Sequence, residues 1–210
     1  MSRIPVSLLL GKAERVRLSI KDNLTQIFAS SVFAPLRHSI PLAQGVCLCC
    51  QLHNETSETL RNLFMQALQR RIKPFQHLFL DCHENIDPAN IIYTLGQEFF
   101  LKERFVYEAT LLVLEPSDIV MIATSTIDTS LYKLLKNTDA IVVDENKIDR
   151  EQCDSFYQQL DQLYRQFTSL SPLLKPATII RLAHFEEDYL QARQDWLLRE
   201  HQLKKHRLFL

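Results

Sequence analysis

The feature that most constrains the fold is a set of short segments in which apolar residues follow one another without interruption. Examples are LLL at 8–10, LFL at 78–80, LLVL at 111–114 and AIVV at 140–143. A strand that is apolar at successive positions is covered on both faces, as in a parallel sheet between helices. Longer stretches with helical period separate these segments. The pattern therefore predicts an α/β fold with a doubly wound, mostly parallel sheet and helices on both faces.

The individual elements follow from the same periodicities and from the residues that flank them. Asp87 and Asp149 each stand just before a helical stretch, where an aspartate caps the first turn. The predicted strands lie at residues 4–10, 46–50, 77–81, 109–114, 140–143 and 178–182. The predicted helices lie at residues 14–28, 57–71, 88–98, 130–136, 150–168 and 186–206.

A length of 210 residues suits one α/β domain with a sizeable core. We expect this domain at residues 1–183, followed by an amphipathic helix within 184–210. This last segment carries acidic residues first and basic residues last, which complements the helix dipole. Whether the helix packs on the domain or on a partner is left open by the sequence.

Charge and hydropathy exclude several partners. A formal net charge of -1 gives no general attraction to nucleic acid or to an anionic membrane. No apolar stretch approaches the roughly 18 to 20 residues of a membrane span, and the N-terminal apolar run does not fit a signal peptide. We therefore expect a cytoplasmic protein that binds neither nucleic acid nor membranes.

The cysteines indicate a metal or thiol site. Cys47, Cys49 and Cys50 form a Cys-x-Cys-Cys motif in a chain with five cysteines, an odd number that does not suit a disulfide framework. On the strand predicted at 46–50, Cys47 and Cys49 would share a face, and Cys50 would need a turn to join them. Thiolates at this spacing suit Zn2+ or another divalent transition metal. Candidates for a fourth ligand are His53, Cys82, His83 or a water molecule. Alternatively, the cysteines are small apolar residues of the core.

Four segments, in the right order and at about the right spacing, resemble the GTPase domain of CobW-like P-loop metallochaperones. They are GVCLCC at 45–50, PFQHLFLDCHENIDPANIIYTL at 74–95, TLLVLEP at 110–116 and TDAIVVDENKIDREQ at 138–152. The resemblance covers about residues 4–182. It implies a P-loop nucleotide-binding fold, a metal-handling role and a metalloenzyme client or other protein partner. It also implies a C-terminal domain, in whose place this sequence has the terminal helix.

The P-loop itself has diverged. The motif requires Gly-x-x-x-x-Gly-Lys-Ser/Thr, whose backbone amides surround phosphates and whose hydroxyl binds magnesium. The matching segment is GKAERVRL at 11–18, which keeps Gly11 but has Val16 at the second glycine, Arg17 at the lysine and Leu18 at the hydroxyl. Val disfavours a positive φ, and Leu offers no oxygen to a hard cation. We therefore expect no catalytic residue and no bound GTP or Mg2+.

Other nucleotide-binding positions are altered as well. Glu84 stands where the family has a phosphate-sensing glycine, and Asp81 stands where it has an acid. An Asn-Lys-x-Asp sequence is present at 146–149, but an ungapped comparison puts Asp144 in the place of the family's asparagine, and a helix cap explains Asp149 equally well. The remnant nucleotide site consists of Gly11, Arg17, Asn146, Lys147 and Asp149.

The residues and the resemblance together favour a non-hydrolysing, CobW-like pseudo-GTPase. Its role would be metal handling, metal homeostasis or metalloenzyme maturation through the Cys-x-Cys-Cys motif. One alternative is an interaction or assembly subunit whose cysteines only fill the core. A second alternative is a divergent active GTPase. A homo-oligomer is left open in each case.

Overall fold

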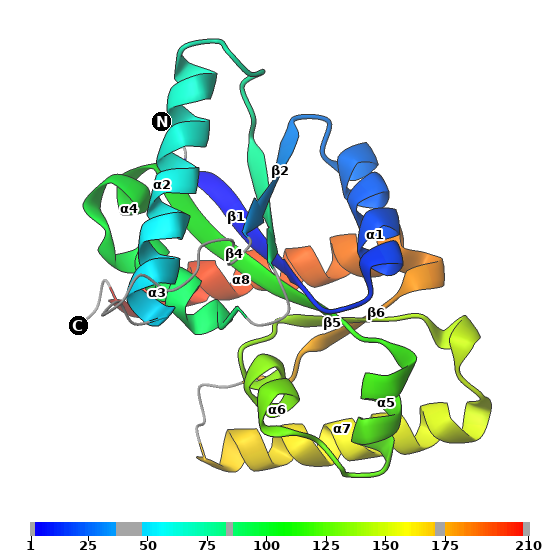
Figure 1. Ribbon diagram of the computed structural model, residues 1–210. Helices are drawn as coiled ribbons and strands as arrows, with labels where there is room; N and C mark the ends of the chain where they lie inside the picture. Colours follow the sequence, from blue (N-terminus) through cyan, green and yellow to red (C-terminus); the bar gives the residue numbers. More distant parts are fainter. Residues whose placement is uncertain (1–2, 37–47, 83–85, 171–174, 208–210) are drawn as a thin grey trace.

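The computed structural model describes residues 3–36, 48–82, 86–170 and 175–207, with the backbone alone at 48–52 and 199–207 (Figure 1). Its centre is a parallel sheet with the strand order β2-β3-β1-β4-β5-β6. The strands are β1 Ile4–Leu10, β2 Ser31–Leu36, β3 His77–Cys82, β4 Phe105–Val113, β5 Ala140–Val143 and β6 Thr178–Arg181.

Helices follow the strands in alternation. They are α1 Glu14–Ile27, α2 Leu48–Leu68, α3 Pro88–Gln97, α4 Phe99–Arg104, α5 Pro116–Ala123, α6 Thr129–Lys136, α7 Arg150–Leu170 and α8 Phe185–Arg207, with short 3-10 helices η1 Glu145–Lys147 and η2 Leu182–His184. None of the helices within the described ranges has the length and apolar character needed to cross a bilayer.

The two faces of the sheet carry different helices (Figure 1). α1 and α8 cover one face, where their apolar residues pack on β1, β3, β4 and β5. α2 to α7 cover the other face and form the larger core. The buried side chains of α8 in the first core are Phe185, Tyr189, Ala192 and Trp196. The predicted α/β class with a doubly wound sheet is confirmed, and α8 packs on its own domain through this stripe.

The strand predicted at residues 46–50 is wrong for the residues that the structure describes. The backbone at 48–50 opens α2, and the strand next to β3 is β2 instead. The described part of this segment, at 48–50, is helical, and a short apolar run cannot by itself distinguish a strand from a helix. Pro35 made β2 an unlikely strand by sequence, but β2 is an edge strand, where proline is tolerated.

A buried polar cluster joins the sheet to α8. Glu108 Oε2 lies 3.1 Å from His77 Nε2 and accepts a hydrogen bond from the Ser7 hydroxyl at 3.0 Å. Glu108 Oε1 accepts from Arg193 Nε at 3.0 Å. The pairing of β1 with β4 shifts register between Val6 and Ser7, and such a bulge re-aims a side chain. Burial raises the pKa of Glu108, but the bonds from His77, Arg193 and Ser7 outweigh it and lower that pKa below its ordinary value.

Two helices end in left-handed residues other than glycine. Arg70 has φ 57° after α2, and Ser125 has φ 56° after α5. The amide of the next residue donates to the carbonyl five positions earlier in both cases, at 2.8 Å from Arg71 and 2.9 Å from Thr126. This is the hydrogen-bond pattern of the Schellman cap, in which glycine is usual.

Candidate functional site

The turn after β1, where a P-loop would lie, is only three residues long. β1 ends at Leu10 and α1 begins at Glu14. Gly11 has φ +122°, and a Cβ built on it would lie 2.2 Å from the carbonyl oxygen of Val113. Only glycine tolerates this backbone and this approach. The turn is therefore pressed against the end of β4.

The positions that correspond to the second half of a P-loop belong to α1. Val16 is buried in the core, and the amide of Arg17 donates to the carbonyl of Ala13 at 2.9 Å, as in a regular helix. Leu18, at the position of the magnesium-binding hydroxyl, is 52% exposed. The backbone that would surround phosphates is thus already committed to helical hydrogen bonds.

Arg17 and Lys21 both pair with Asp81 at the end of β3. Arg17 Nη1 lies 3.0 Å from Asp81 Oδ1, and Lys21 Nζ lies 2.5 Å from Oδ2. Arg17 Nη1 also donates to the carbonyl of Cys82 at 3.1 Å. These side chains are only 15 to 25% exposed, with Asp81 the most covered. The carboxylate at the acid position of the family is therefore occupied by two cations of its own chain.

No sequence motif identified Lys21 as part of this site. Its spacing from Arg17 is four residues, which on a helix places two side chains on the same side. Because α1 starts immediately after a short turn, that side of its first turns lies over the end of β3. The helix start was predicted at residue 14, but the packing of α1 against the end of β3 was not.

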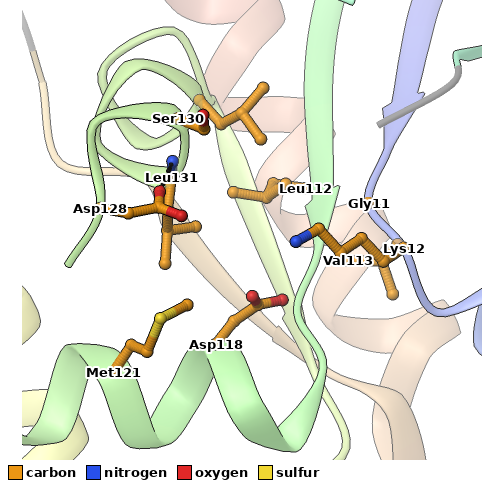
Figure 2. A pocket seen from close by; sticks show the side chains of 10 residues that line it. Gly11, Lys12, Leu112, Val113, Asp118, Met121, Asp128, Ser130 and Leu131 are labelled. Carbon is orange, nitrogen blue, oxygen red and sulfur yellow. Dashed lines mark hydrogen bonds between the residues drawn. The ribbon is translucent and has the colours of Figure 1, made fainter. Parts of the chain in front are cut away.

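A small cavity remains beside the turn, between the carboxyl ends of β1 and β4 (Figure 2). The helices that follow these two strands, α1 and α5, pack on opposite faces of the sheet. A crevice between two strands whose helices diverge in this way is the usual ligand site of a doubly wound sheet. Figure 2 shows Lys12 entering from the β1 side and Asp118 from α5. The cavity measures about 140 Å³, whereas ligand pockets typically measure about 300–1,000 Å³.

The acidic groups of this cavity already hold backbone amides. Asp118 accepts from the amide of Glu115 at 2.9 Å, and Asp128 accepts from the amide of Leu131 at 2.7 Å. Asp128 is the N-cap of α6, and Asp118 forms a capping box with Glu115, the N-cap of α5. The carboxylates thus serve the ends of α5 and α6.

The Asn-Lys-x-Asp sequence follows β5 as a 3-10 turn. Asn146 and Lys147 are exposed, and Lys147 Nζ pairs with Asp144 Oδ2 at 2.8 Å. Asp149 Oδ1 accepts from the amide of Gln152 at 2.8 Å. The helix cap predicted for Asp149 is confirmed, and so is the cap predicted for Asp87, which accepts from the amide of Ala89. A role for this turn in nucleotide binding stays a prediction.

The cysteine motif lies at the start of α2 as far as the structure describes it. Cys47 and His83 lie outside the described residues, and the backbone of Cys49 and Cys50 forms the first turn of the helix. The alternation expected on a strand therefore does not apply. On a helix, His53 follows Cys50 by three residues and Cys49 by four, the spacings that share one side. Within the described ranges, no three His, Cys, Asp or Glu side chains form a group that could hold a metal ion.

Cys82, a candidate fourth ligand, lies in β3 and belongs to the larger core. It is fully buried, and its thiol donates to the carbonyl of Leu80 at 3.4 Å. Burial, followed by the charge of Asp81, raises the pKa of the Cys82 thiol well above its ordinary value. Metals bind the thiolate, so such a thiol is a poor ligand.

Comparisons with known proteins agree with this architecture. Residues 26–175 match the family described as CobW/HypB/UreG, nucleotide-binding domain. No curated protein matches the sequence. The fold resembles that of the Zn(II)-bound YjiA GTPase from E. coli, with a TM-score of 0.51 and 16% identity over 80% of this chain and 55% of that one.

A second similar structure is a Zn(II)-bound triple variant of YjiA in which one glutamate and two neighbouring cysteines are replaced by alanine. Its TM-score is 0.57, with 16% identity over 88% of this chain and 59% of that one. The chain therefore spans less than two thirds of the length of either structure.

Proposed function

The chain belongs to the CobW/HypB/UreG family of nucleotide-binding domains, and from that premise we propose that it is a non-hydrolysing member, a pseudo-GTPase. The observation that carries this proposal is the pairing of Asp81 with Arg17 and Lys21. In P-loop GTPases an aspartate and the P-loop hydroxyl hold the magnesium ion. Here the acid is neutralised from within the chain, and Leu18 replaces the hydroxyl. These residues do not fit Mg2+.

The shape of the β1 turn supports the same proposal. Three residues cannot surround a triphosphate, and Gly11 lies too close to Val113 for the turn to widen without moving β4. The match to the family begins at residue 26, downstream of Gly11 and Arg17. The segment that would contact phosphate thus lies outside the matched residues.

We propose that the protein acts in metal homeostasis or metalloenzyme maturation, with Zn2+ or another divalent transition metal as its cargo. The family and the Zn(II)-bound structures of YjiA support a role with metals. Cys49 and Cys50 belong to the backbone of α2, and cysteine is a ligand type suited to such metals. A metalloenzyme client or another protein partner in the cytoplasm would receive the metal.

The test of the pseudo-GTPase proposal is thermal unfolding with and without millimolar GTP and Mg2+. A ligand present at 100 times its Kd would add about 2.7 kcal/mol of stability and raise Tm by several degrees. We expect no rise for this chain, with the GTPase YjiA as the positive control. A Tm that climbs with GTP concentration would establish the divergent active GTPase instead.

A further inference from the structure

His53 has a defined tautomer because of its partner on α3. His53 Nδ1 lies 2.9 Å from Thr94 Oγ1. The Thr94 hydroxyl has one proton, and it donates this proton to the carbonyl of Asn90 at 2.8 Å. Thr94 Oγ1 must therefore accept from His53, so the neutral ring carries its proton on Nδ1. Nε2 is left with an unprotonated lone pair.

The partner that fixes this tautomer is itself immobile. Thr94 is 1% exposed and lies inside α3, where its hydroxyl bonds to the carbonyl one turn earlier. His53 is half-buried and lines an open cleft of about 560 Å³ between α2 and α3, together with residues such as Asn90 and Tyr93. The imidazole is thus oriented by the core but borders solvent.

An imidazole with its Nδ1 proton donated to a protein acceptor and its Nε2 unprotonated is the usual state of a metal-binding histidine. Helical spacing places His53 on the same side of α2 as Cys49 and Cys50. Mixed thiolate and imidazole ligands are typical of Zn2+. We propose that His53 binds, through Nε2, the divalent metal carried by Cys49 and Cys50, with Thr94 as the positioning residue. This inference rests on the metal-handling half of the proposed function.

The tautomer can be tested without any metal. Two-bond proton–nitrogen correlation spectra of the 15N-histidine-labelled chain at pH 8 distinguish a protonated ring nitrogen from an unprotonated one. We expect the His53 proton on Nδ1 in the wild type, and loss of this preference in Thr94→Val, which keeps the shape of the side chain but removes the acceptor. A proton found on Nε2 in the wild type would overturn the inference.

Metal binding is tested by titration with Co2+ followed by visible absorption, with Zn2+ competition for affinity. We expect His53→Ala to lose affinity and change the ligand-field bands, and Thr94→Val to lose about 10- to 100-fold in affinity. His184→Ala, at an exposed histidine of η2, is the matched control and should bind like the wild type. Thermal unfolding of each variant checks that it is folded.

The outcomes separate the two proposals. If Cys49→Ser/Cys50→Ser abolishes binding but His53→Ala keeps the wild-type affinity and spectrum, the role of His53 is wrong and the metal-handling proposal stands. If the wild type binds neither Co2+ nor Zn2+ more tightly than micromolar, the metal-handling proposal fails and the His53 inference fails with it.

Discussion

Two carboxylates of the sheet each have basic side chains as partners, but the carboxylates lie at different depths. Asp81 lies at the carboxyl end of β3, and its partners Arg17 and Lys21 are 16 and 25% exposed. Glu108 lies inside, where it and His77 are 4 and 3% exposed, and its second partner Arg193 is 27% exposed. Partly exposed ion pairs contribute about 0–1 kcal/mol, whereas removing one partner of a buried pair costs about 3–5 kcal/mol.

The two carboxylates therefore differ in the property that they are expected to affect, nucleotide binding for Asp81 and folding stability for Glu108. We expect the Asp81 pairing to contribute little to the free energy of unfolding, and under the proposed function it occupies the position at which a magnesium ion would bind. The Glu108 cluster has no contact with that place and joins β1, β3 and β4 to α8. Under the proposed function, the magnesium position at the carboxyl end of β3 could change at little cost to the stability of the fold.

The largest expected effect is at Glu108. Glu108→Ala should lower the free energy of unfolding by about 3–5 kcal/mol, because His77 and Arg193 lose the buried carboxylate that pairs with them. Urea unfolding measures this change. The matched control is Asp161→Ala, which removes an exposed pair with Arg165 and should cost no more than about 0.5 kcal/mol. Equal losses in the two variants would show that depth does not distinguish these pairs.

The same cluster should give a pH dependence of known sign. The folded pKa of Glu108 lies below its ordinary value of 4.5. Its contribution is therefore complete above pH 4.5 and is lost as the pH falls through the folded pKa. We expect the stability advantage of the wild type over Glu108→Gln to shrink in this acidic range, as measured by urea unfolding at a series of pH values. An advantage that is constant from pH 6 to pH 3 contradicts the lowered pKa.

A smaller effect is expected at Asp81, at the carboxyl end of β3. Asp81→Asn should lower the free energy of unfolding by about 1 kcal/mol or less, because Arg17 and Lys21 remain partly solvated without their partner. The measurement is again urea unfolding, beside Glu108→Gln as the buried counterpart. A loss at Asp81 as large as that at Glu108 would remove the contrast between the two regions.

The smallest expected effect is none at all. Restoring the P-loop residues by Val16→Gly, Arg17→Lys and Leu18→Ser together should not produce a rise of Tm with GTP and Mg2+. These positions lie within α1 rather than in a loop, so new side chains do not create backbone amides that face phosphate. Isothermal titration calorimetry with GTP is the direct measurement, and saturable binding would contradict the geometric argument.

Sequence patterns predicted the central strands well, because their apolar runs are short and bounded. The strands predicted at 4–10 and 140–143 coincide with β1 and β5. β2 was missed because Pro35 interrupts it, and its place as an edge strand depends on pairing with β3, a contact distant in sequence. The helices α4 and α5 were not predicted, since each is short and adjoins a strand.

The contacts around the turn after β1 could not be read from the sequence, although the residue replacements could. Replacement of the P-loop glycine, lysine and hydroxyl is readable from Val16, Arg17 and Leu18. The pairing of Arg17 with Asp81 is not, because it joins α1 to the end of β3, and a contact so distant along the chain has no local sequence signal. The Glu108 cluster requires a bulge, for which the sequence has no recognisable signal.

The left-handed residues Arg70 and Ser125 have a consequence for the unfolded chain. With only three glycines in 210 residues, the unfolded ensemble has fewer backbone conformations to lose, which favours folding entropically. The cost appears at these two helix ends, where a side chain occupies a conformation about 1–2 kcal/mol less favourable than for glycine. The low glycine content thus lowers the backbone entropy of the unfolded chain, and it also leaves two helix ends with strained residues.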